Sequence, residues 1–221
     1  MSAAQRLVPF LLIIAAAMFA RAPYLIDAAP EEATMGLVQK IFYFHVPSAI
    51  AMFLSAFVCG IASAVFLFRR KADADRVAVA AAELTVLLGL VVLVTGPLWA
   101  RKSWGVWWQW DARLTSSLVM WLVFWAYLLL RRFGGPGSDK LSAAVAIFGA
   151  ALVPFVYWSV NMWRTLHPST NVVPTLPKPM MGPFLWCLFA WLALYVVLLT
   201  MRVALERLRV QLDALYLALE D

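Results

Sequence analysis

The stretch VAVAAAELTVLLGLVVLVTGPL, at residues 77–98, decides what class of protein this chain belongs to. It contains one charged residue, Glu83. As a helix rising about 1.5 Å per residue, it is long enough to cross the roughly 30 Å of hydrocarbon in a bilayer. Backbone groups at that depth have no water to bind, so only a helix satisfies them over this length. The stretch therefore predicts a transmembrane helix.

Outward from this stretch, the chain contains other apolar runs of similar length. The predicted spans cover about residues 7–26, 47–68, 77–98, 114–130, 141–160 and 184–203. The composition agrees, because 64% of the residues are hydrophobic and 14% are charged, against about 45–50% and 25% in soluble domains. We therefore expect an all-α integral membrane protein whose six helices form a single domain over residues 1–203.

The first run has a second interpretation as a signal peptide, since Arg6 precedes it and small residues end it. Pro23 would follow the candidate cleavage site directly, and the apolar run continues to Ile26. These two features favour a helix that is retained.

The basic residues between the spans indicate how the chain is oriented. The densest clusters, RRKADADR at 69–76 and RRFGGPGSDK at 131–140, lie on connectors that share a side with both termini. Short connectors rich in Lys and Arg stay in the cytoplasm. Both termini are therefore predicted inside, and the loops at about 27–46, 99–113 and 161–183 outside. This distribution accounts for the net charge of +6 without a nucleic-acid partner.

The segment after the sixth span, at 204–221, has a helical pattern of leucines. They recur at spacings of three and four, at Leu205, Leu208, Leu212, Leu215 and Leu219. The spacing predicts a cytoplasmic amphipathic helix, although the seam is short for a coiled coil. Such a helix either lies along the inner surface of the protein or docks a cytoplasmic or membrane partner.

Both histidines of the chain are predicted on the outer face. His45 lies in KIFYFHVPSA, and we expect Pro47 to open the second span with His45 just above it. His167, in NMWRTLHPSTN, follows the fifth span. A single histidine at an interface is more often a structural residue than a ligand. A pair cannot form the usual zinc site of three or four protein ligands, but it can supply the two axial ligands of a haem iron.

The loop between the third and fourth spans contains WGVWWQWD, at residues 104–111. If this stretch is helical, one face carries the residues at i, i+3, i+4 and i+7, which are Trp104, Trp107, Trp108 and Asp111, and Trp110 is displaced from it. Such a face would offer a flat apolar wall to haem. Tryptophan also gathers at membrane interfaces as an aromatic belt, and that alternative stays open. Asp111 also suits the N-cap of the fourth span, which begins near Ala112.

Haem carries two propionates that need cationic partners, which Arg provides well. The outer loops contain several candidates, namely Arg101, Lys102, Arg113, Arg164 and Lys178.

These motifs resemble those of known haem-handling membrane proteins. WGVWWQWDARLTSSL resembles their tryptophan-rich WWD signature, and YFHVPSA and WRTLHPST look like the two histidine segments of the six-helix CcmC family. The resemblance implies a multi-pass protein of the bacterial inner membrane that binds haem b on its periplasmic face. It further implies that His45 and His167 ligate the iron, while the tryptophans and Asp111 form the surface that holds the porphyrin.

The resemblance also implies partners. They are the ABC transporter subunits CcmA and CcmB, the small membrane protein CcmD, and the haem chaperone CcmE, which would receive haem for c-type cytochromes. The protein would then handle haem and not act as an enzyme. Two alternatives are a membrane b-type cytochrome, which would usually hold haem between helices, and an enzyme using Asp111 with a histidine as acid and base. The enzyme alternative lacks a recognisable nucleophile or metal cluster.

Overall fold

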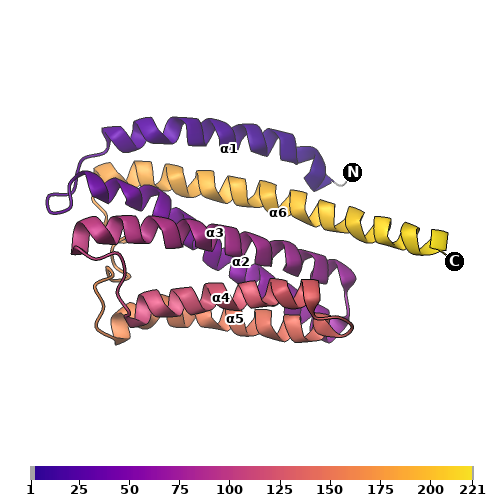
Figure 1. The fold of residues 1–221 in the computed structure, drawn as a ribbon. Helices are drawn as coiled ribbons and strands as arrows, with labels where there is room; N and C mark the ends of the chain where they lie inside the picture. Colours follow the sequence, from indigo (N-terminus) through magenta and orange to yellow (C-terminus); the bar gives the residue numbers. More distant parts are fainter. Residues whose placement is uncertain (1–2, 221) are drawn as a thin grey trace.

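The computed structural model describes residues 3–220, and long helices make up most of this part of the chain (Figure 1). They are α1 (Ala3–Ala28), α2 (Phe42–Arg69), α3 (Ala72–Trp104), α4 (Ala112–Phe133), α5 (Ser138–Met162) and α6 (Lys178–Glu220), with a short 3-10 helix, η1 (Leu37–Ile41), before α2. All six long helices have the length and hydropathy to cross a membrane. The prediction of an all-α protein with six membrane-spanning helices is confirmed.

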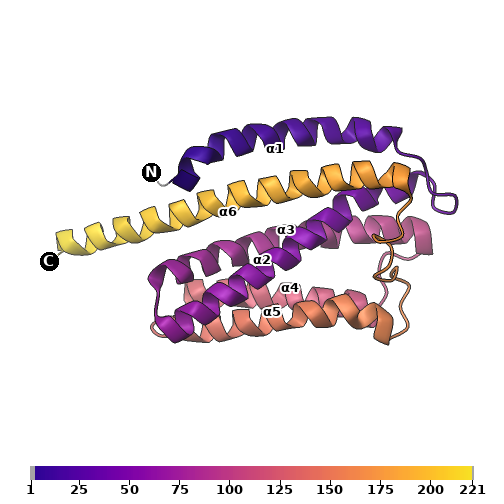
Figure 2. The same cartoon turned by 180° about the vertical axis from the view of Figure 1, so that it is seen from behind.

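The helices are arranged in three groups (Figures 1 and 2). Helices α2 and α3 pack extensively against each other at the centre, α4 pairs with α5 on one side, and α1 pairs with α6 on the other. Both described chain ends lie at one end of the bundle, together with the turns that join α2 to α3 and α4 to α5. The three longer loops meet at the opposite end, which we call the loop end. Which end faces the cytoplasm stays a prediction from the charges.

Small residues allow the central helices to approach closely. A Cβ atom added at Gly60 of α2 would lie 2.4 Å from the Cβ atom of Ala150 of α5. Buried alanines, among them Ala56 and Ala146, line the same core. Small residues at helix crossings are typical of membrane bundles, where association depends on van der Waals packing. The crossing of α2 and α5 therefore tolerates no larger residue at position 60 without a shift of the backbone.

The second helix begins earlier than the sequence suggested. It starts at Phe42, so Pro47 lies inside the helix and the expectation that Pro47 opens it is wrong. The 3-10 turn of η1 leads directly into α2, and its carbonyls accept the amide of Phe42. Helical backbone is thus established before the proline, which removes one amide close to the helix start. His45 therefore lies within the first turns of α2 and not above them.

Helix α6 is 43 residues long, about 65 Å at 1.5 Å per residue, and extends past the other helices (Figure 1). The amphipathic helix predicted at 204–221 is its continuation as far as Glu220, and Asp221 lies outside the described residues. The leucines of its seam are 51–82% exposed.

Ion pairs join α6 to α3 at the end opposite the loops. The guanidinium of Arg202 donates two hydrogen bonds to the carboxylate of Glu83, one of them 2.6 Å long, and lies 3.5 Å from Glu206. Arg207 lies 3.2 Å from Asp73. The single acid of the third span thus has a defined partner, 119 positions away in the sequence. The pair gives Glu83 a structural role.

We expect the Arg202→Ala variant to be less stable by about 1–2 kcal/mol, between the values typical of exposed and buried pairs. The substitution leaves the Glu83 carboxylate without its cation in an apolar helix. Thermal unfolding in detergent measures the loss. Arg209→Ala is the matched control, because Arg209 is exposed and in none of the ion pairs between described residues. A double variant, Glu83→Gln with Arg202→Gln, should recover much of the stability. Equal melting temperatures for Arg202→Ala and Arg209→Ala would contradict the role of this pair.

Candidate functional site at the loop end

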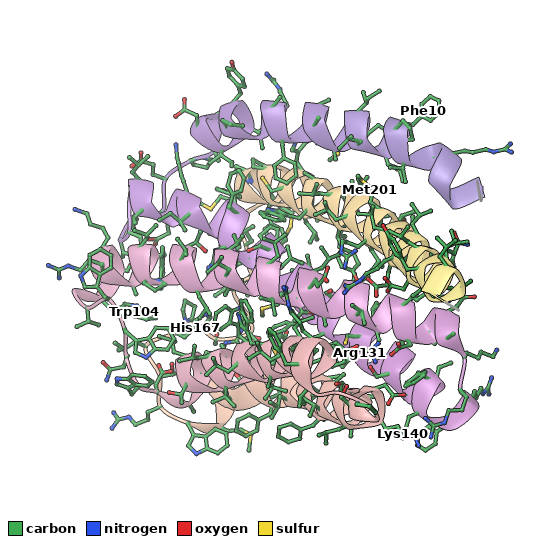
Figure 3. The ribbon with its side chains drawn as sticks, turned by 45° about the vertical axis from the view of Figure 1, so that its right-hand side comes forward. Phe10, Trp104, Arg131, Lys140, His167 and Met201 are labelled. Carbon is green, nitrogen blue, oxygen red and sulfur yellow. The ribbon has the colours of Figure 1, made fainter. Side chains whose placement is uncertain are left out.

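Four parts of the chain meet at the loop end. They are the start of α2, the end of α3, the segment 105–111 that leads into α4, and the segment 163–177 between α5 and α6. Figure 3 shows Trp104 and His167 at this end, well separated from Arg131 and Lys140 at the other. The topology thus brings together the histidine and tryptophan segments, as the sequence suggested.

The stretch WGVWWQWD does not form the helical face that we considered. Helix α3 ends at Trp104 because Gly105 adopts a left-handed conformation, with φ of 76°, as is common just after a helix. Residues 105–110 are not helical, so Trp104 does not share a helix face with Trp107 and Trp108. The interpretation of one stripe ending in Asp111 is therefore wrong.

The tryptophans form two edge-on pairs. Trp104 packs against Trp99 with ring centroids 5.0 Å apart, and Trp108 packs against Trp110 at 5.7 Å. Trp107 and Trp110 are 57% and 75% exposed, whereas the indole nitrogen of Trp108 is buried and has no hydrogen-bond partner among the described residues. The segment thus exposes the rings of Trp107 and Trp110 and buries the indole N–H of Trp108. Exposed rings suit an interfacial belt as well as a flat ligand.

Asp111 connects the tryptophan segment to the His167 segment. Its Oδ1 atom accepts a hydrogen bond of 2.8 Å from the amide of Leu114, which confirms it as the N-cap of α4. Its Oδ2 atom accepts from the hydroxyl of Thr165, and the Thr165 oxygen in turn accepts from the amide of His167 at 3.0 Å. Thr165 was not identified from the sequence. A Thr two residues before a functional histidine is a recognisable local motif, since its hydroxyl can bind the backbone two positions on.

One ring nitrogen of His167 has a hydrogen-bond partner, and the other has none within residues 3–220. Its Nδ1 atom lies 2.9 Å from the carbonyl oxygen of Pro168. A carbonyl only accepts, so Nδ1 carries the hydrogen and Nε2 keeps its lone pair. The pKa of His167 is lowered to about 4, mainly by burial and next by the nearby Arg113 cation. The ring is therefore neutral at physiological pH, the form that binds a metal.

His45 belongs to the same site. His45 lies in the first turns of α2, at the same end of the bundle as His167 (Figure 3), and the charge of Arg113 acts electrostatically on His167. The Nδ1 atom of His45 is 2.8 Å from the hydroxyl oxygen of Thr95 on α3. Among the described residues, no three His, Cys, Asp or Glu side chains gather to hold a metal by themselves. A metal at this pair would need further ligands, which a porphyrin supplies.

Of the predicted cations, Arg113 is the one that the structure places with the histidines. It lies in the first turn of α4 and donates a hydrogen bond to the carbonyl of Val156 on α5. Within residues 3–220 it forms no ion pair, so its charge has no acidic partner at contact distance. Arg101 is exposed and donates to the carbonyl of Gly105. The remaining candidates are exposed side chains, at Lys102, Arg164 and Lys178.

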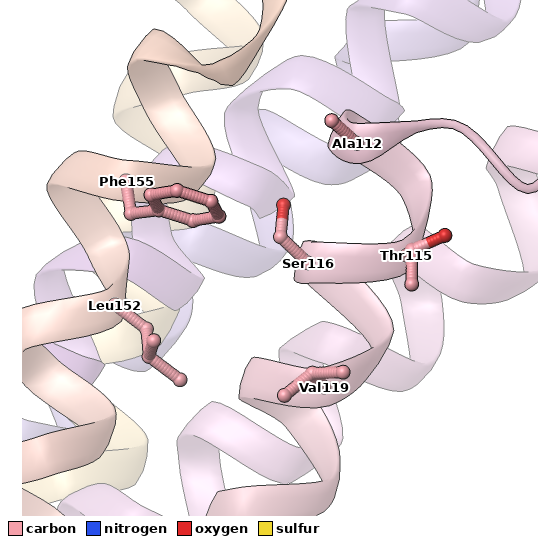
Figure 4. Close-up of a pocket in the computed structure, with 6 residues that line it drawn as sticks. All are labelled: Ala112, Thr115, Ser116, Val119, Leu152 and Phe155. Atoms are coloured by element: carbon pink, nitrogen blue, oxygen red, sulfur yellow. The ribbon is translucent and has the colours of Figure 1, made fainter.

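Two apolar cavities lie near this end of the bundle. One of about 300 Å³ lies between α4 and α5, where Phe155 and Leu152 face Ser116 and Val119 (Figure 4). Another of about 380 Å³ is lined by residues of α1, η1 and α2, including Pro23, Lys40 and Phe44. Neither is lined by a histidine or by a tryptophan of the loop. The two histidines and the tryptophans of the loop therefore lie outside both cavities.

Comparison with known proteins gives a consistent result over nearly the whole chain. The CcmC family, described as heme exporter protein C, matches residues 1–217. The heme exporter protein C of Bradyrhizobium diazoefficiens is 36% identical over 202 residues, which cover 87% of this chain and 76% of that protein. The protein of the same name from Haemophilus influenzae is 32% identical over 190 residues, covering 82% and 76%. The one from Escherichia coli K12 is 31% identical over 181 residues, covering 79% and 72%.

Proposed function

Because this chain belongs to the CcmC family of heme exporter proteins, with a role in haem handling for cytochrome c biogenesis, we propose that it binds haem b between His45 and His167 at the loop end. The observation that carries the proposal is the state of His167. Its neutral imidazole has Nδ1 bonded to the Pro168 carbonyl and Nε2 without a hydrogen-bond partner among the described residues, which is how protein histidines bind a metal.

The residues around the histidines fit the rest of a haem. Arg113 has a charge without an acidic partner among the described residues, and a propionate would supply one. The buried indole N–H of Trp108 has no acceptor in this part of the chain and can donate to the same kind of oxygen. The exposed rings of Trp107 and Trp110 provide flat apolar surface for a porphyrin edge. His45 and His167 would hold the haem iron through their imidazoles, and the porphyrin would supply its remaining ligands.

The position of the site suits delivery. Both ligands lie at the end of the bundle, and two tryptophans of the adjoining segment are exposed there. We infer that this end is periplasmic in the bacterial inner membrane and that the protein passes haem to the chaperone CcmE. In the same proposal the ABC transporter subunits CcmA and CcmB and the small protein CcmD assemble with it. The chain itself binds and presents haem and makes no covalent bond.

The optical spectrum of the purified protein tests this function. We expect a six-coordinate haem spectrum, and on mixing with the purified acceptor chaperone we expect the absorbance to move to the acceptor fraction after separation. Absence of haem binding by the purified protein would overturn the proposal.

A b-type cytochrome is the second candidate, and one observation favours it. His45 lies within α2 and contacts α3, so one ligand sits between helices as in electron-transfer proteins. That candidate requires haem to stay bound while electrons move. Retention of all haem in the presence of excess acceptor, together with reversible reduction, would favour it over delivery.

A substitution of Arg113 tests whether its charge pairs with a haem propionate or whether its side chain only packs against the haem. We expect Arg113→Gln to weaken haem binding about tenfold, as expected for loss of one charge-assisted pair. Binding of haem dimethyl ester, whose propionates are neutral, should be unchanged by the substitution. Arg209→Gln serves as the control, because Arg209 is exposed and lies on α6 far from the loop end. Equal losses for haem and for its ester would show that Arg113 acts through packing and not through a propionate.

A further inference from the structure

Thr95 of α3 holds the ring of His45, and no comparison or motif identifies it. Its hydroxyl oxygen lies 2.8 Å from Nδ1 of His45. The same oxygen is 2.7 Å from the carbonyl oxygen of Val91, one turn earlier in α3. Thr95 therefore lies between a backbone acceptor and the imidazole. What it does depends on where its one hydrogen goes.

The Thr95 hydroxyl donates its hydrogen to a backbone carbonyl, that of Val91. A carbonyl oxygen can only accept, so the short contact to Val91 requires Thr95 to donate. The hydroxyl then has only its lone pairs left for His45, and Nδ1 of His45 must be the donor. Thr95 thereby selects the tautomer with hydrogen on Nδ1 and the lone pair on Nε2. His167 adopts the same tautomer through the carbonyl of Pro168.

The neighbouring residue makes room for this arrangement. A Cβ atom at Gly96 would lie 3.3 Å from Cε1 of His45 and 3.9 Å from its Nδ1, so the ring lies directly against the backbone of α3. A side chain at position 96 would press on the ring edge. Thr95 and Gly96 together therefore restrict both the position and the rotation of the imidazole.

We propose that Thr95 is a positioning residue for haem: it fixes the Nδ1-protonated tautomer of His45 so that Nε2 is presented to the iron. The proposal rests on the proposed function for its consequence, because the ligand role of His45 belongs to that proposal. The tautomer itself is a property of the protein without haem. Outer partners of metal-binding histidines raise the basicity of the ligand, and their loss costs roughly 10–100-fold in affinity.

Nuclear magnetic resonance of the haem-free protein tests the tautomer directly. The chain has two histidines, so labelling with ¹⁵N-histidine gives two ring systems, and His167→Ala assigns them by subtraction. We expect His45 to carry hydrogen on Nδ1 in the unmodified protein and in Thr95→Ser. In Thr95→Val, which removes the acceptor and keeps the shape, this tautomer should no longer dominate. Persistence of the Nδ1–H form in Thr95→Val would overturn the proposal.

Haem titration then tests the consequence. We expect Thr95→Val to bind haem 10–100-fold more weakly, with a raised reduction potential because the ligand is less basic, and Thr95→Ser to behave as the unmodified protein. Thr85→Val is the control, since Thr85 also donates to a carbonyl one turn earlier in α3 but has no hydrogen bond to a histidine in the described part of the chain. Identical affinity and potential in Thr95→Val and Thr85→Val would refute the positioning role. If the unmodified protein binds no haem, the proposed function fails, while the tautomer experiment still stands on its own result.

Discussion

Replacement of His167 by alanine is expected to lower the affinity for haem by about 100-fold or more and to convert a six-coordinate spectrum into a five-coordinate one. Loss of an outer partner of a ligand already costs 10–100-fold, so loss of the ligand itself should cost at least the upper end of that range. His45→Ala should have a similar effect, because His45 is the second ligand in the proposed site. The protein contains no third histidine to take over.

Titration of haem into the purified variants, followed by absorbance, measures both the affinity and the coordination. Added imidazole should restore the six-coordinate spectrum of each single variant, since the space left by the side chain admits a free ring. Circular dichroism and thermal unfolding show whether the bundle is intact. A six-coordinate spectrum that survives both substitutions would rule out the histidine pair as the ligands.

Asp111 is the residue for which we expect the second large effect. Alanine at this position removes the N-cap of α4, worth about 1 kcal/mol, and at the same time breaks the hydrogen-bond chain through Thr165 to the amide of His167. The His167 segment then loses its connection to the tryptophan segment. We expect haem affinity to fall roughly 10–100-fold, the range seen when the support of a ligand is lost.

Two further variants separate the two contributions of Asp111. Asp111→Asn keeps an oxygen for the amide of Leu114, so it should retain most of the stability of α4 while weakening the link to Thr165. Thr165→Val leaves the cap in place and breaks only the link, so it should lower haem affinity without lowering the melting temperature. In the double variant Asp111→Ala with Thr165→Val the losses of affinity should not add, because both act through one chain. Additive losses would show that Asp111 and Thr165 act independently on haem.

Much of this architecture follows from patterns within single segments of the sequence. The six spans are long apolar runs, and an even alternation of spans places both histidine segments and the tryptophan loop at one end. The N-cap role of Asp111 could be predicted because an acid stands just before the fourth apolar run. These features depend on local composition and order, which need no knowledge of how helices pack.

The two predictions that proved wrong both concern helix ends, where a single residue can determine the backbone conformation. Gly105 interrupts the spacing that would have put Trp104 and Trp108 on one face, and a glycine at that place was also a signal for the end of α3. Pro47 suits the first turn of a helix, but the helical backbone begins before it, in the turn of η1. Glycine and proline each occur at more than one position near a helix end. The residue type alone therefore does not fix the residue at which the helix begins or ends.

The remaining features depend on how the helices are rotated and packed against each other. The contact of Thr95 with His45 joins residues 50 positions apart, and the pair of Arg202 with Glu83 joins residues 119 apart. Nothing in the spacing of either segment selects these partners, because the pattern of one helix does not say which face of a distant helix it will meet. The selection of Arg113 among the predicted cations has the same origin, since it depends on the packing of α4 beside α5.

The two histidines are supported in different ways, and this difference bears on how the proposed site would release its ligand. His45 lies on the packed helix α2, and its ring contacts α3. His167 lies in a loop that is held by hydrogen bonds of Thr165 and Asp111. Loops open at lower free energy than packed helices. If haem is held as proposed, His167 should therefore release it more readily than His45.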